Sequence, residues 1–150
     1  MGGARRGPIR YDHGDLTSTR FERDSFDVTV RLSVIEHGVD TEAYVREMSR
    51  LLRPSAILNT STDYWVDPID TRGQVAYGVP VKIFKRLDVE AMLTAAQGYG
   101  LWATGEIDLN CNEKAVTWDR VDLKFTFTCF ALEKRGSDIN VASIDHCTDR

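Results

Sequence analysis

Hydrophobic and polar residues alternate along residues 25–35, and this period of two predicts a buried strand. The apolar positions of its predicted inner face are Phe26, Val28, Val30 and Leu32, continued by Val34. Several of these residues are β-branched, which favours a pleated and at least half-buried backbone. Residues 8–13 alternate in the same way and run into Gly14-Asp15, so we expect a short first strand that ends in a turn.

The period then changes to that of a helix. The apolar residues form one helical stripe made of Tyr44, Val45, Met48, Leu51 and Leu52. Asp40 or Thr41 is suited to cap the start of this helix, and Pro54 ends it. The charged side chains of the helix are expected on its solvent-exposed side: Arg46, Glu47 and Arg50.

Residues 56–62 predict a strand, and residues 63–80 predict a long polar loop. A second helix is centred on residues 89–96; its start is poorly capped, and it closes at Gly98 or Gly100. Two further strands are expected over 101–109 and 121–132. One face of the last strand would carry Val121, Leu123, Phe125, Phe127 and Cys129, with Cys129 as a buried thiol.

Strands that alternate with helices predict an α/β protein with a mostly parallel sheet and helices on its faces. The last two strands have no helix between them, so the C-terminal strand should be antiparallel. We expect one domain over residues 8–134, a disordered leader over residues 1–7 and a flexible tail over residues 135–150.

Composition narrows the function classes. The chain has 150 residues and a net charge of −4, which does not favour nucleic acid or an anionic membrane as a partner. No apolar run is long enough for a membrane span or a secretory signal. The three cysteines form no CxxC pair, so we expect neither a zinc site nor a disulfide framework, but reduced thiols in a cytoplasmic protein.

Three stretches, taken in order, resemble class I S-adenosylmethionine-dependent methyltransferases over about residues 8–133. The first runs from Gly14-Asp15-Leu16-Thr17 to Ser25-Phe26-Asp27, and it is similar to the family's third-strand exit and fourth-strand entry. Leu32-Ser33-Val34-Ile35-Glu36-His37 resembles the fourth-strand exit. The third stretch, Arg50-Leu51-Leu52-Arg53-Pro54 with Ile57-Leu58, resembles the junction of a helix with the fifth strand.

The resemblance covers only the C-terminal portion of that family's domain. It implies a truncated Rossmann-like sheet without the first two strands and without the glycine-rich turn between them. No GxGxxG sequence occurs in the chain, and the carboxylate that holds the ribose hydroxyls is also absent. Because such a turn points N–H groups at the ligand, its absence predicts weak cofactor binding.

For the cofactor S-adenosylmethionine, the resemblance implies that Asp15 accepts from the adenine amino group and that Leu16 lies against the ring. Ser33 and Val34 would face the methionine part. The alternative for Asp15 is a turn residue that bonds its own backbone. Glu36 and His37 are the catalytic candidates, with His37 as a general base; the alternative is that both only preserve the fold.

Substrate contacts are expected from residues that follow the strand at 56–62: Tyr64, Trp65 and Asp67, together with Asp63. The alternative is that these residues pack over the sheet. The first predicted function is that of a methyltransferase-like protein that acts on a small molecule and is inactive alone. The second is a non-catalytic interaction module.

A sheet without its first two strands leaves the strand at 26–34 with a free, apolar edge. We expect that edge to pair, either with residues 8–13 or, in preference, with a second copy of the chain in a homodimer. A different chain that supplies the missing half is the other partner considered.

Overall fold

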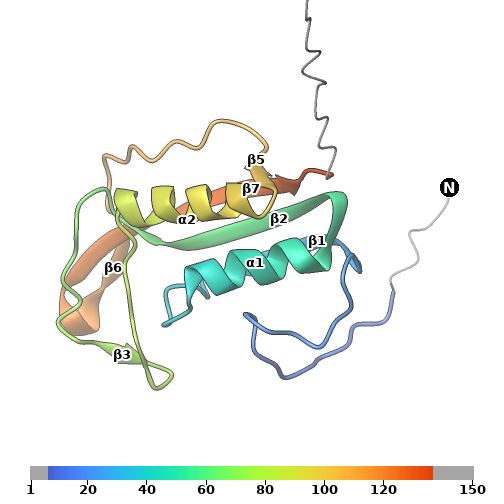
Figure 1. Ribbon diagram of the computed structural model, residues 1–150. Coiled ribbons are helices and arrows are strands. Elements are labelled where there is room, and N and C mark those ends of the chain that lie inside the picture. Colours follow the sequence, from blue (N-terminus) through green and yellow to red (C-terminus); the bar gives the residue numbers. More distant parts are fainter. Residues whose placement is uncertain (1–6, 137–150) are drawn as a thin grey trace, which may run out of the picture.

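The computed structural model describes residues 7–136 (Figure 1). The predictions for the leader and the tail concern residues that lie almost entirely outside this range. The main elements of the described chain are β1 (Phe26–Leu32), α1 (Thr41–Leu51), β2 (Leu52–Tyr64), α2 (Arg86–Gly98), β5 (Leu101–Ala103), β6 (Val116–Trp118) and β7 (Leu123–Lys134). The segment between β2 and α2 contains a small hairpin, β3 (Val75–Ala76) and β4 (Val79–Pro80).

The main sheet has the strand order β1-β2-β7-β5, and β6 pairs with the far end of β7. β1 and β2 are parallel, whereas β7 is antiparallel to both β2 and β5. β1, β2 and β5 therefore run in one direction, and β7 alone opposes them within this path. This is the predicted α/β sheet with a C-terminal antiparallel strand, and the fold class is confirmed.

Both helices pack on one face of the sheet, where they enclose the main core (Figure 1). β2 supplies this face from alternate positions, and its buried residues are Ala56, Leu58, Thr60, Thr62 and Tyr64. α1 begins where predicted, because the Asp40 carboxylate accepts from the backbone N–H groups of Glu42 and Ala43, each at 3.0 Å. Its stripe then buries Met48 and Leu51 against the sheet.

The opposite face of the sheet is open along β1. Leu32 is 61% exposed, and Val28 and Val30 are also exposed, whereas Thr29 between them is buried toward the helices. The prediction that the Phe26–Leu32 series faces the core is therefore wrong for these three residues. The reason is that both helices cover the other face and no described segment covers this one.

The C-terminal strand also differs from its predicted pattern. Leu123 and Phe125 are buried in a second, smaller cluster, but Phe127 and Cys129 are exposed on the open face. Cys129 is thus not a buried thiol, and its Sγ lies 3.3 Å from Asn59 Oδ1. The buried positions shift by one along the strand, so that Phe130 faces the main core instead.

The N-terminal strand predicted over residues 8–13 does not form. This segment is exposed and irregular, and it makes no ladder with β1. The carboxylate of Asp12 instead pairs with Arg10 and with Arg20 on the returning part of the same loop. The option in which residues 8–13 cover the β1 edge is therefore wrong for this chain fold.

Several helix and strand boundaries differ from the predicted ones, and a local feature of the chain explains each difference. β2 begins at Leu52, directly after α1, because a bulge with Ser55 at φ 66° accommodates Pro54. α2 starts at Arg86, and it is capped after all, since Lys85 N donates to Asp88 Oδ2 at 3.1 Å. β5 stops at Ala103 instead of continuing to residue 109, and β6 takes over the pairing along β7.

A buried hydroxyl pair links the first helix to the sheet. Tyr44 Oη and Thr60 Oγ1 lie 2.7 Å apart, and both residues are fully buried. We predict that Tyr44→Phe lowers the free energy of unfolding by about 1–2 kcal/mol, because Thr60 keeps a buried hydroxyl without its partner. Tyr77→Phe is the control, since Tyr77 is 92% exposed. Urea denaturation of both variants measures the difference, and equal stabilities would contradict the prediction.

Candidate functional site

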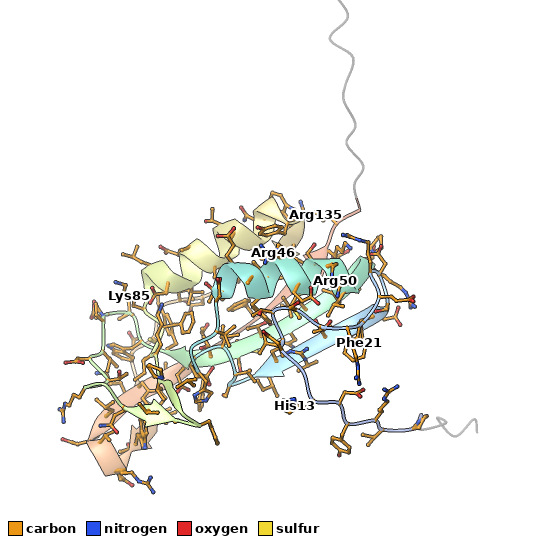
Figure 2. The ribbon with its side chains drawn as sticks, turned by 60° about the horizontal axis from the view of Figure 1, so that its bottom comes forward. His13, Phe21, Arg46, Arg50, Lys85 and Arg135 are labelled. Carbon is orange, nitrogen blue, oxygen red and sulfur yellow. The ribbon has the colours of Figure 1, made fainter. Side chains whose placement is uncertain are left out.

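A cavity of about 430 Å³ lies beside the free edge of β1, within the size range of small-molecule sites. One wall is the loop over residues 12–21, and Figure 2 shows His13 and Phe21 on this loop and Arg50 on α1. The other wall comes from β1 and the turn after it, through Arg31 and Val34. The cavity therefore joins two of the stretches that the sequence singled out.

Asp15 and Leu16 both line the cavity, as their predicted roles require. Asp15 Oδ1 accepts from Thr17 N at 2.8 Å and from Thr17 Oγ1 at 2.7 Å, and these bonds lower the pKa of the carboxyl group. These hydrogen bonds are the ones expected if Asp15 is a turn residue. They use only Oδ1, and Oδ2 has no partner among the described residues, so the same carboxylate can still accept a hydrogen bond from a ligand.

The loop is fastened to α1 by Glu47. The Glu47 carboxylate accepts from Thr19 N at 2.8 Å and Thr19 Oγ1 at 2.7 Å, and Arg50 donates to both of its oxygens. Glu47 is only 7% exposed, so its expected place on the solvent side of the helix is wrong. The contact joins residues 28 positions apart, and no local pattern in the sequence announces it.

The two residues expected at the methionine part differ in position. Val34 lines the cavity, whereas Ser33 does not. Ser33 adopts a left-handed conformation at φ 51° and donates its N–H to Ser61 O at 3.3 Å, which ends β1. This turn directs the chain toward Val34 and Glu36.

The catalytic candidates lie outside this cavity. Glu36 is 1% exposed, and its Oε2 accepts from Thr62 Oγ1 at 3.4 Å; burial raises the pKa of its carboxyl group. His37 stacks edge-on against Tyr77 of the β3–β4 hairpin, with ring centroids 5.4 Å apart. Its Nδ1 is buried and has no partner among the described residues.

Asp63 lies close to Glu36 at the carboxyl end of β2. Burial, and to a lesser extent the charge of Glu36, raise the pKa of Asp63 to about 7. The Asp63 side chain belongs to the open face of the sheet, since the neighbouring positions Thr62 and Tyr64 are buried toward the helices. The chain thus has two carboxyl groups with raised pKa values, one just after β1 and one at the end of β2.

The residues predicted to contact the substrate mostly pack within the protein. Tyr64 is fully buried, and its hydroxyl donates to Leu109 O at 2.8 Å. Trp65 packs against the second cluster, with Lys114 Nζ 4.6 Å from its ring. Asp67 is exposed, and none of the three lines the cavity beside β1.

Two negative findings concern the described residues 7–136. They contain no cluster of three or more potential metal ligands. None of their helices combines the length and the apolar character that crossing a membrane requires.

Comparison with known proteins identifies this architecture. Residues 2–59 match the family described as "Methyltransferase domain". No curated protein matches the chain in sequence. The chain has the class I methyltransferase fold, and residues 2–59 match the methyltransferase domain family, so the resemblance seen in the sequence is confirmed.

Solved structures agree with this fold. The chain is similar to the S-adenosylmethionine-dependent methyltransferase of Mesorhizobium loti, with a TM-score of 0.59 and 18% identity, over 85% of this chain and 71% of that one. The cyclase SpnF gives a TM-score of 0.59 at 12% identity, over 83% and 55%. The putative methyltransferase of Haloferax volcanii, in complex with its Trm112 activator, gives 0.58 at 14%, over 82% and 60%. The chain thus spans less than two thirds of the last two proteins.

The Glu47 contact makes a pH prediction. Arg50, and then Thr19, lower the pKa of Glu47 from 4.5 to about 2. A lowered folded-state pKa stabilises the protein above the unfolded value, by roughly 3 kcal/mol here, and this contribution disappears as the pH falls from about 5 to 2. We expect Glu47→Gln to lower stability at pH 7 and to flatten its pH dependence in that range. Chemical denaturation across pH measures this, with Glu90→Gln as the exposed control.

Proposed function

We propose that the cavity beside β1 holds the adenosine part of S-adenosylmethionine, and that the protein takes part in methyl transfer to a small molecule. The observation that carries this proposal is that Asp15, Leu16 and Val34 line one cavity on a class I methyltransferase fold. The Asp15 carboxylate would accept from the adenine amino group through its free oxygen. Leu16 supplies an apolar contact for the purine ring, and Val34 would face the methionine part.

The chain's own residues form only part of a pocket for the cofactor. The sequence has neither the glycine-rich turn that points N–H groups at the cofactor nor a carboxylate placed for the ribose hydroxyls. The bound cofactor would supply the activated methyl group, and the residues of the chain would contribute only by positioning the cofactor and the substrate. We infer that residues 1–150 are inactive by themselves, because the remaining contacts to the cofactor have to come from outside them.

His37 is the proposed general base and Glu36 its neighbour in the site, but their surroundings favour different roles. The burial of Glu36 supports a fold-preserving role, because a substrate cannot reach its carboxyl group without a rearrangement. The unpartnered Nδ1 of His37 supports a role as proton acceptor once Tyr77 moves aside. Among the proposed substrate contacts, Asp67 is the one whose exposure supports that role.

The binding proposal has a direct test. We expect S-adenosylhomocysteine to bind the chain with a Kd on the order of 1 mM or weaker, and to shift the amide resonances of Leu16 and Val34 in an NMR titration. Asp15→Asn keeps the turn but removes the charge, so it should weaken binding several-fold. Shifts confined to other regions would contradict the site. A micromolar Kd would contradict the inference that the pocket is incomplete.

The alternative function, a non-catalytic interaction module, is favoured by the exposed face and edge of β1. SpnF, a cyclase with this fold, supports keeping activity and fold separate. We propose that two copies of the chain pack the open faces of their β1 strands together and so bury Val28, Val30 and Leu32. The Haloferax methyltransferase is in complex with an activator, which supports a partner chain as the other form of assembly.

We also propose a cytoplasmic location. The two cysteines among the described residues, Cys111 and Cys129, are free, which supports this proposal.

The dimer is tested by one charge on the open face. Val30→Lys should shift the protein from dimer to monomer in sedimentation velocity at about 100 μM, because an ammonium group would be buried between the copies. Leu87→Lys is the matched control, since Leu87 is 65% exposed on α2, away from β1. A wild-type protein that is monomeric at this concentration contradicts the homodimer and leaves a different chain as the partner.

A further inference from the structure

Arg31 contributes a positive charge to the cavity beside β1. Its side chain lines the cavity and is partly buried, and one guanidinium N–H donates to the neighbouring Val30 O at 2.9 Å. This bond fixes the group without neutralising it. No carboxylate among the described residues forms a salt bridge with Arg31.

The other charged groups of the cavity are already engaged. Asp12 pairs with Arg20 and with Arg10 outside the cavity, and Asp15 is held by Thr17. His13, also on the loop, is the remaining titratable group that lines the space. The cavity therefore has a hydrogen-bond acceptor in Asp15 and a cationic donor without a salt-bridge partner among the described residues in Arg31, and Leu16 and Val34 are apolar residues of the same lining.

We propose that this cavity binds an adenine nucleotide, with Arg31 contacting the anionic phosphate and Asp15 accepting from the base. The placement of the base rests on the proposed function, and the anion at Arg31 goes beyond it. A planar guanidinium with several free N–H groups matches a phosphate in geometry and charge. Partial burial strengthens this attraction relative to a fully solvated arginine.

The same charge opposes the sulfonium of S-adenosylmethionine. A cationic ligand in a cavity of this size lies within a few ångströms of Arg31 and is repelled. We therefore expect the order of affinity to be AMP first, then the uncharged adenosine, with S-adenosylmethionine weaker than its thioether product. Arg31 thus acts as a specificity-determining residue.

The experiment measures the ratio of the Kd values of adenosine and AMP by NMR titration of the full chain. We expect AMP to bind about tenfold more tightly than adenosine, and increasing salt to reduce this ratio. Arg31→Gln keeps an amide donor for Val30 O but removes the charge, and it should bring the ratio close to one. Arg31→Lys should restore most of it. A ratio of two ligands on one protein is insensitive to a general loss of stability.

Arg46→Ala is the matched control, because Arg46 is exposed on α1 and does not line the cavity (Figure 2). It should leave the ratio unchanged. Equal affinities of AMP and adenosine in the wild type, or an equal loss in Arg46→Ala, overturn the role of Arg31 while adenosine binding still supports the proposed function. If neither ligand shifts the resonances of Leu16 and Val34, both proposals fail.

Discussion

Both helices of this protein cover the same face of the sheet, and most of its other properties depend on that arrangement. Each parallel connection, from β1 to β2 and from β2 to β5, carries its helix across one side, and the apolar stripes of α1 and α2 meet the alternate residues of β2 there. One well-formed core results. The other face of the same strands has no such cover in the described chain, which is why valines and a leucine of β1 lie exposed.

The candidate cavity lies beside the free edge of β1. β1 has a strand neighbour on one side only, and the loop over residues 12–21 passes along its other side without pairing with it. Glu47 fixes that loop to α1 through Thr19, and the cavity lies between the loop and the strand. The buried carboxylate is stabilised because Arg50 and the Thr19 donors satisfy both of its oxygens. The cavity walls thus depend on one charged contact from the neighbouring helix.

Two charged side chains of the cavity concern different features of a ligand, namely the amino group of its base and its net charge. The methyltransferase fold alone fixes neither preference. Asp15 suits the amino group of an adenine base, and it can do so while it shapes its own turn. Arg31 suits an anion and disfavours a sulfonium cation. In the proposed site, the fold gives the place, and individual side chains would decide which adenine compound is preferred.

Sequence by itself determined the order of the two helices and the strands that flank them, the α/β class and the antiparallel last strand, because these depend on local periodicity and on caps such as Asp40. The resemblance of short motifs also singled out Asp15, Leu16 and Val34, which line one cavity in the structure. Tertiary structure alone decided which side of β1 is buried, since alternation gives two faces but does not say where the helices lie. It likewise decided that Glu36 and Tyr64 are buried and that Glu47 and Arg31 shape the cavity, because contacts between residues distant in sequence leave no periodic signal.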